Sequence, residues 1–319
     1  MTAYIIRRVL WGIALLVIVC GLTFVLFRIF PTGNPALLRA GRDPQPKLVM
    51  EIERVLGLNK SLPVQFWDYL KDIFLHFNLG YSYYSLESVK GLIAERLPVT
   101  ISLTVGAAVL WVVAGIGIGI ISALRRGSFL DRASMGTALV LISAPEFWLG
   151  LIFLFLFAQD IGKFKIFPGA GTYVGLTSDP WGWFTSLIMP WFVLASGAAA
   201  IFARLTRGSL IETMKEDYIR TARAKGLPEH KVVRQGVRSA INPVVTLLGL
   251  EIGTLLGGAV LVETVFNIPG VGKLAYESII DSDFSVVQGT VLLAALFIIV
   301  ANIVVDIGYA YLDPRVRYS

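Results

Sequence analysis

Three acidic residues lie within long apolar stretches of the sequence, where an ionised side chain is costly. Glu146, Glu251 and Asp306 each fall inside a run of mostly apolar residues, and Asn302 precedes Asp306 by four positions. Residues four apart share one face of a helix. Because a charge inside a bilayer is expensive, such residues are candidates for a solute or ion path. The sequence therefore predicts four path candidates, Glu146, Glu251, Asn302 and Asp306.

Each candidate also has a structural interpretation. Glu251 lies two residues from Gly249 and from Gly253, in a glycine stripe that continues to Gly257 and favours close helix contact. Its carboxylate can line a water-filled path or form a paired structural charge. The pair of Asn302 and Asp306 can form a gate or a hydrogen-bonded packing contact.

No other group of residues predicts catalysis or metal binding. The chain has one cysteine, Cys20, and its two histidines, His76 and His230, are far apart in sequence. The phosphate-binding pattern G-x-x-x-x-G-K-[ST] is missing, and the nearest string, Gly270 to Lys273, lacks its first glycine and its Ser or Thr. We therefore expect no catalytic residue, no metal site and no cofactor in this chain.

The composition is that of a membrane protein. Of 319 residues, 55% are hydrophobic and only 16% are charged, and the mean hydropathy is +0.72. An average soluble domain has about 25% charged residues, so an ordinary cytosolic enzyme is excluded. A membrane-spanning helix needs about 20 mostly apolar residues. Six stretches meet that requirement: Val9–Phe27, Pro98–Leu124, Ala133–Ala158, Trp181–Ala203, Ala240–Val262 and Phe284–Leu312. The predicted fold class is an all-α membrane protein with six transmembrane helices.

Several residues inside these stretches predict local features. Pro145 and Pro190 predict kinks, since proline removes a backbone donor. Gly115 and Gly119 predict close packing against another helix. Three tryptophans, Trp181, Trp183 and Trp191, are interpreted as anchors at the membrane interface.

The distribution of lysine and arginine predicts that both termini are cytoplasmic. With that orientation, the inside segments hold Arg7, Arg8 and the basic residues between Arg204 and Arg238, whereas the short outside loops hold only Lys163, Lys165 and Lys273. This is the bias of the positive-inside rule. Because topology explains the net charge of +6, we expect no nucleic-acid partner.

The long outside segment, residues 31–97, predicts short amphipathic helices. Apolar residues recur at helical spacing over Lys47–Leu56, where Gly57 can end the helix, and again over Leu62–Phe77. Two interpretations remain open for this segment: a cap that rests on the membrane, or a docking surface for an outside partner.

The cytoplasmic loop, residues 204–241, is rich in basic residues. Glu216–Lys225 predicts a helix that Gly226 can break, and Pro228 can start a second helix in its first turn. Composition alone leaves two interpretations, an anchor on anionic membrane lipid or a contact with a cytoplasmic protein.

Within this loop stands a ten-residue string made of Asp217, Tyr218, Ile219, Arg220, Thr221, Ala222, Arg223, Ala224, Lys225 and Gly226. It resembles the EAA motif of ABC importer permeases in the peptide and nickel branch. Arg220-Thr221-Ala222 stands where Glu-Ala-Ala is typical. The resemblance continues near the C-terminus, from Glu263 to Gly272 and from Asp313 to Arg315, and near the N-terminus, from Tyr4 to Arg8 and from Arg96 to Thr100.

The ordered set of motifs is similar to the B-type permease subunit of oligopeptide, dipeptide and nickel importers, and covers nearly the whole chain. The resemblance implies a type I ABC importer permease fold in a bacterial or archaeal inner membrane. It also implies four domain-level segments: 1–30 with the first transmembrane helix, the extracytoplasmic 31–97, a permease core 98–312 and a cytoplasmic tail 313–319. The ten-residue string would be the coupling helix.

The partners that this resemblance implies are a second homologous permease, two cytoplasmic P-loop ATPases, an extracytoplasmic substrate-binding protein and membrane lipid. The ATPases would bind ATP and Mg²⁺ and would hydrolyse the ATP, so this chain would not be an enzyme. The expected cargo is a short peptide, with nickel or another small solute as the alternative. A self-contained channel or secondary transporter that uses the intramembrane acids is a further alternative.

Overall fold

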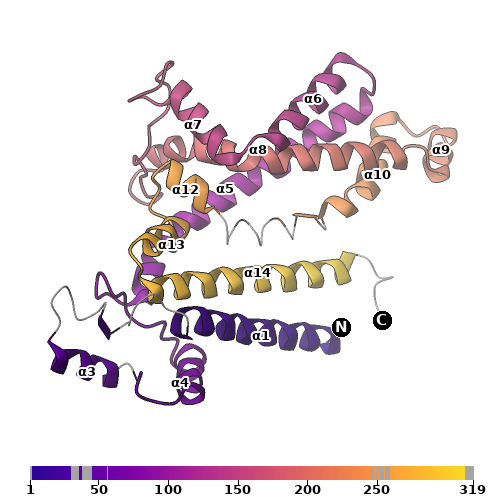
Figure 1. Ribbon diagram of the computed structural model, residues 1–319. Helices are drawn as coiled ribbons and strands as arrows, with labels where there is room; N and C mark the ends of the chain where they lie inside the picture. The colour runs from indigo at the N-terminus through magenta and orange to yellow at the C-terminus, as the bar shows by residue number, and fades with distance from the viewer. Residues whose placement is uncertain are drawn as a thin grey trace.

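The chain folds into a set of long helices joined by shorter ones (Figure 1). A computed structural model describes residues 2–29, 36–37, 45–55, 57–245, 247–248, 251, 255 and 259–312. Within these residues, extended pairing is limited to two isolated bridges, Tyr81 with Ser88 and Ala158 with Phe167. The described part of the chain is therefore helical, in agreement with the predicted all-α class.

The helices of the described residues are α1 (Thr2–Phe24), the π-helical turn η1 (Val25–Ile29), α3 (Pro46–Val55), α4 (Leu62–Phe74), α5 (Val89–Leu124), α6 (Phe129–Ser143), α7 (Glu146–Phe157), α8 (Pro180–Thr213), α9 (Asp217–Ala224), α10 (Glu229–Ala240), α12 (Val260–Val265), α13 (Val271–Ile280) and α14 (Phe284–Leu312). Four of them, α1, α5, α8 and α14, are long and apolar enough to cross a membrane, and α6 with α7 makes a fifth if the bent pair counts as one span. Nine of the 23 residues of the predicted span Ala240–Val262, among them the three glycines of its stripe, lie outside the described residues.

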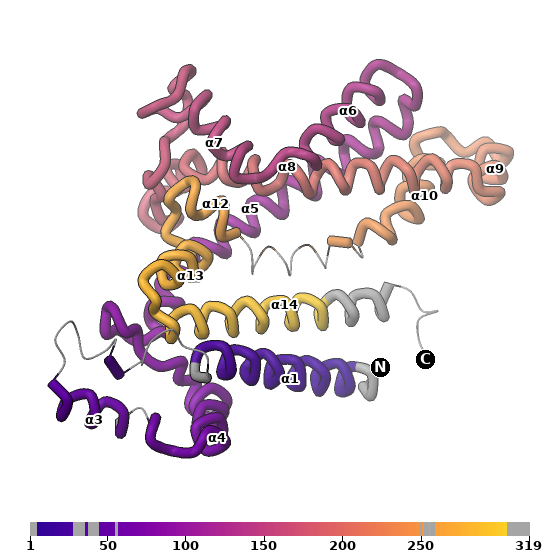
Figure 2. The backbone as a smooth tube through the Cα atoms, viewed as in Figure 1, coloured from indigo at the N-terminus to yellow at the C-terminus, as the bar shows by residue number. Residues whose placement is uncertain are grey.

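The stretch Ala133–Ala158, predicted as one kinked span, is instead two helices. Helices α6 and α7 meet at an angle of 109°, which the tube in Figure 2 shows as an open V. The reason is local: Pro145 is the N-cap of α7, and Ala144 before it is extended at ψ 126°, as the residue before proline prefers to be. Pro190, by contrast, lies within the uninterrupted helix α8.

The core is built on α5 and α8, which pack along much of their lengths. A Cβ added to Gly115 would lie 2.6 Å from Cβ of Phe202, and one added to Gly119 would lie 2.6 Å from Cβ of Thr206. The two glycines thus allow close helix contact, as predicted. Trp111 on α5 is fully buried, with its ring 6.0 Å from that of Phe202.

A second layer consists of α1 and α14, which pack side by side (Figures 1 and 2). The outer segment contains the two predicted amphipathic helices, α3 and α4, and Gly57 between them has a φ of +65°. Phe66 and Tyr69 of α4 contact Phe24 of α1, with ring centroids 5.2 and 5.8 Å away. These contacts fix α4 across the C-terminal end of α1.

Candidate coupling loop and translocation path

The candidate coupling helix α9 follows directly from the long helix α8. The chain turns at Met214–Glu216 and then forms the eight residues of α9. Ile219 and Ala222 of this helix are buried with Val232 of α10, and Met214 and Leu227 pack against them. The three- and four-residue spacing of these apolar positions gives α9 one buried face.

The other face of α9 is open. Asp217 and Arg220 have exposed side-chain fractions of 93% and 72% and form an ion pair of 3.4 Å within the helix. Tyr218, Thr221, Ala224 and Lys225 are exposed as well. Of the ten predicted coupling residues, Ile219 and Ala222 therefore pack the loop internally, and the other eight form an exposed polar surface around one aromatic ring.

The turn between α9 and α10 has the chemistry that the sequence predicted. Gly226 adopts a left-handed φ of +75°, and Pro228 is the N-cap of α10. Arg223 donates two hydrogen bonds to Glu229, from Nε to Oε2 at 3.2 Å and from an Nη to Oε1 at 2.7 Å. The Arg223 guanidinium holds the pKa of Glu229 below its usual value.

Helix α10 returns against α8 and fixes the loop to it. A Cβ added to Gly236 would lie 2.7 Å from Sδ of Met214 and 3.4 Å from Cδ1 of Leu210. Leu210 is fully buried. The loop is thus packed onto the end of α8.

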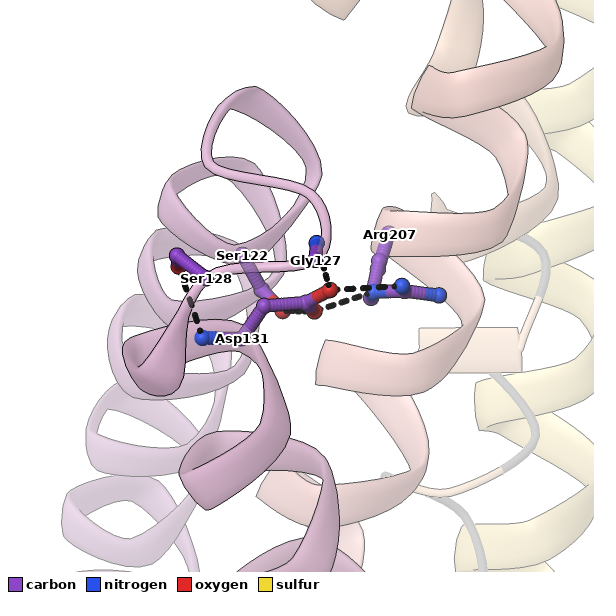
Figure 3. A network of polar contacts seen from close by, with 5 residues as sticks. All are labelled: Ser122, Gly127, Ser128, Asp131 and Arg207. Carbon is purple, nitrogen blue, oxygen red and sulfur yellow. Dashed lines mark hydrogen bonds and ion pairs between the residues drawn. The ribbon is translucent and has the colours of Figure 1, made fainter.

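One turn before Leu210, Arg207 of α8 binds a buried aspartate of α6 (Figure 3). Arg207 Nε donates to Asp131 Oδ1 at 2.6 Å, and an Nη donates to Oδ2 at 2.9 Å. The Ser122 hydroxyl of α5 also donates to Oδ1, and the Gly127 N–H donates to Oδ2 at 2.8 Å. Sequence reasoning missed this network, because Asp131 and Arg207 lie 76 positions apart.

The structure brings two of the path candidates together. Glu146 is the first residue of α7 and is exposed, directly after the bend at Pro145. Its carboxyl group lies within electrostatic range of that of half-buried Glu251. Asn302 is half-buried on α14, which packs against α1 and α13. The side chain of Asp306 lies outside the described part of the structure.

A fully buried acid on the short helix α12 was not among the predicted site residues. Glu263 of α12 accepts a 2.7 Å hydrogen bond from the Thr100 hydroxyl and a 2.8 Å bond from the Lys273 N–H. Lys273 ends the string Gly270 to Lys273, which begins α13. The chain's own carboxylate thus occupies the helix N-terminus that a phosphate would need. Among the described residues, no cluster of three or more His, Cys, Asp or Glu side chains is arranged to hold a metal.

Comparison with known proteins gives a consistent result over the whole chain. Residues 115–318 match the family model of binding-protein-dependent transport system inner membrane components, and residues 1–104 match the model of the N-terminal part of such membrane components. A protein of Brucella abortus named as a peptide transport system permease is 41% identical over 320 residues, with both chains fully covered. A glutathione transport system permease of Pectobacterium atrosepticum is 40% identical, and a dipeptide transport system permease of Alkalihalophilus pseudofirmus is 36% identical, again over the full length of both chains.

Proposed function

Because this chain belongs to the family of binding-protein-dependent transport system inner membrane components, we propose that it is the permease subunit of an ATP-driven importer for short peptides. Its relatives carry the names of peptide, glutathione and dipeptide permeases, which supports a peptide cargo over nickel. Membership in a binding-protein-dependent family also favours an importer with partners over a self-contained channel or secondary transporter.

The proposed topology has six transmembrane helices with both termini in the cytoplasm. Two observations support it. The positive-inside bias places the loop between Arg204 and Arg238 in the cytoplasm. In Figure 1 the first residues of α1 and the last residues of α14 lie toward the same side of the molecule as α9. The sixth span would be formed by residues 240–262, within the type I permease fold.

The exposed face of α9 is the observation that carries the proposed mechanism. Its buried residues Ile219 and Ala222 hold it on α10, while Tyr218 and Ala224 stay accessible. The helix is therefore rigid on one side and open to a partner on the other. We propose that each of two cytoplasmic P-loop ATPases, which bind ATP and Mg²⁺, receives the coupling helix of one permease. No cofactor is assigned to this chain.

The path would form between this chain and a second, homologous permease. Glu146 and Glu251 are the candidates to line it, since Glu146 begins α7 directly after the bend and its carboxyl group is within electrostatic range of that of Glu251. Asn302 and Asp306 of α14 remain path candidates by sequence. An extracytoplasmic substrate-binding protein would deliver the peptide, and ATP-driven closure of the ATPases would switch the helices between outward and inward states. The basic loop also favours contact with anionic lipid.

The proposed function is tested by purification of the tagged chain in mild detergent and identification of its partners by mass spectrometry. The expected result is a second permease and P-loop ATPases, and ATP-dependent uptake of peptide after reconstitution with the co-purified binding protein. Purification of the chain alone or as a homo-oligomer, with flux in the absence of ATP, would contradict the proposal.

A separate substitution tests the proposed coupling role of α9. Ala224→Trp places an indole on the exposed face without touching the buried cluster, so the ATPases should dissociate while the two permeases stay associated. Ala224→Ser is the control at the same position and should retain the ATPases. Full ATP-driven uptake by the Trp variant would contradict the assignment of α9.

A further inference from the structure

We propose that the ion pair of Asp131 and Arg207 is a positioning lock that makes the α5–α6 hairpin move together with the coupling loop during transport. The proposal rests on the function proposed above and goes beyond it, because it assigns a task to two residues that belong neither to the path candidates nor to the candidate coupling helix. Asp131 lies in the first turn of α6, and Arg207, shown with it in Figure 3, lies six residues before the last residue of α8, after which the chain turns into α9.

The pair has the geometry of a rigid connection. Arg207 meets Asp131 with two parallel N–H donors, at 2.6 and 2.9 Å, and the side chains are 26% and 5% exposed. A bidentate contact fixes the direction of both side chains as well as their distance. Ser122 and Gly127 hold the same carboxylate from the end of α5 and from the turn that follows it. One carboxylate therefore joins α5, the turn, α6 and α8.

On one side of the lock, contacts lead without interruption to α9. Ile219 and Ala222 of α9 pack with Val232, and Met214 and Leu227 complete that cluster. Met214 and Leu210 in turn pack closely against Gly236 of α10. Leu210 is three residues, less than one helical turn, from Arg207 along α8. A displacement of α9 is thus passed through packed side chains to the guanidinium of Arg207.

On the other side, the lock leads to the bend that carries a path candidate. Helix α6 runs from Asp131 in its first turn to Ser143. Pro145 and Glu146 follow directly, and Glu146 lies close to Glu251. Because a helix transmits displacement along its axis, motion at Asp131 shifts the bend. The lock thus connects the proposed ATPase contact on α9, through α8, to the path candidate Glu146, through α6.

Close packing alone does not replace this connection. Next to the lock, Gly119 meets Thr206 and the carbonyl of Ala203 through small groups, and such smooth contacts allow helices to slide past each other. The ion pair opposes sliding, since a shift of an ångström breaks both hydrogen bonds at once. We infer that α5, α6 and α8 stay in register because the pair is present.

The test measures coupling in the assembled transporter. Asp131→Asn and Arg207→Lys both remove the bidentate contact, whereas Arg204→Lys, an exposed change on the same helix, is the matched control. Each variant is compared for partner retention, ATP hydrolysis and peptide uptake in vesicles. We expect partner retention and ATP hydrolysis to persist while uptake per ATP falls by about tenfold, within the range of coupling between distant sites. The control should keep the wild-type ratio.

An unchanged ratio of uptake to ATP hydrolysis in both variants would overturn the lock. If Asp131→Asn does not assemble, Arg207→Lys decides, since it retains the positive charge beside Asp131. The double variant should be no worse than the more severe single variant, because two residues that act through one contact are not additive. Additive losses would mean that each residue acts elsewhere.

A second measurement does not depend on cargo. Spin labels at Arg132→Cys on α6 and Arg204→Cys on α8, both exposed, report the distance between the two helices with and without ATP in a Cys20→Ala background. With the lock intact, the distance distribution should stay narrow in both states, and Asp131→Asn should broaden it. Equal distributions with and without the lock would overturn the inference. Failure of the wild-type transporter to take up peptide, by contrast, would contradict the proposed function. The distance measurement would still decide whether the ion pair holds α6 and α8 together.

Discussion

The Thr100 hydroxyl on α5 donates a 2.7 Å hydrogen bond to Glu263 on α12, which is 163 positions away and fully buried. The same hydroxyl accepts a 2.8 Å bond from the N–H of Val271. The Thr100 hydroxyl is therefore a donor to α12 and an acceptor from α13, and it joins α5 to both helices. Both oxygens of Glu263 accept hydrogen bonds, since Oε2 receives the N–H of Lys273.

Glu263→Gln should destabilise the protein although it keeps the volume of the side chain. One carboxylate oxygen becomes an NH₂ group, which then faces a donor, either the Lys273 N–H or the Thr100 hydroxyl. A buried group left without its partner costs about 1–3 kcal/mol. Thermal unfolding in detergent measures the loss. Glu277→Gln, which changes a half-exposed side chain paired with Lys273 on the same helix, is the control and should have little effect. The same unfolding midpoint for both variants would contradict the role of Glu263 as a buried acceptor of two hydrogen bonds.

The sequence predicted the helices better than the contacts between them. Apolar stretches of sufficient length require helices in a membrane, and glycine spacing indicated the close approach at Gly115 and Gly119 correctly. Trp191, however, was interpreted as an interfacial anchor, and the structure buries it to 7% exposure against α5. Its indole Nε1 donates to the Ser102 carbonyl at 3.1 Å. Composition indicates that a tryptophan prefers an interface, but only the fold shows which helix covers it.

The two helices of the loop 204–241 were predictable because their signals are local. Gly226 and Pro228 mark a turn in any context, and the apolar spacing of α9 is contained within eight residues. The lock of Asp131 with Arg207 and the buried Glu263 depend on partners more than 70 positions away. A single sequence carries no signal for such pairs. The bend between α6 and α7 lies between these cases: Pro145 predicted a kink, whereas its angle of 109° depends on packing.

Gly106→Ala should disturb the contact of α5 with α8. A Cβ at this position would lie 2.1 Å from the nearest ring atom of Trp191, and the ring is fixed by its hydrogen bond to Ser102. Overpacking of this kind costs about 1–3 kcal/mol. Gly117→Ala on the same helix is the matched control, because no atom of the described residues lies within 4 Å of its Cβ. Thermal unfolding of the two variants should differ, with Gly106→Ala lower; the same midpoint for both would contradict the close contact.

The pair of Arg223 and Glu229 should make the stability of the α9–α10 turn depend on pH. Because the pair lowers the pKa of Glu229 from its ordinary value of 4.5 in the folded loop, the stabilisation is present above pH 4.5. It is lost as the pH falls through the lowered pKa. A spin label at Thr221→Cys should therefore become more mobile as the pH falls through the lowered pKa of Glu229. In Glu229→Gln the label should be mobile at neutral pH already and change little on acidification. A wild-type label that is equally immobile at pH 7 and pH 3 would contradict a role of the pair.

Gly226→Ala should loosen the connection of α9 to α10 through the backbone alone. Its φ of +75° lies in the left-handed region, and no atom of the described residues lies within 4 Å of the position that an alanine Cβ would fill. Any effect of Gly226→Ala therefore comes from its backbone conformation and not from a steric clash of the new Cβ. An L-residue other than Asn or Asp loses about 1–2 kcal/mol in this conformation, so the turn should open more often.

Hydrogen exchange of the amides of α9 in the detergent-solubilised complex measures that opening. Gly226→Asn should exchange more slowly than Gly226→Ala, because asparagine tolerates the left-handed region better. Gly208→Ala in α8, where a Cβ also has no neighbour within 4 Å among the described residues, should leave α9 unchanged or better protected, since alanine favours a helix. Weaker retention of the ATPases should follow the same order as the exchange rates, because an open turn no longer holds the exposed face of α9 in one orientation. Equal protection in the Ala and Asn variants would mean that the turn does not require the left-handed conformation.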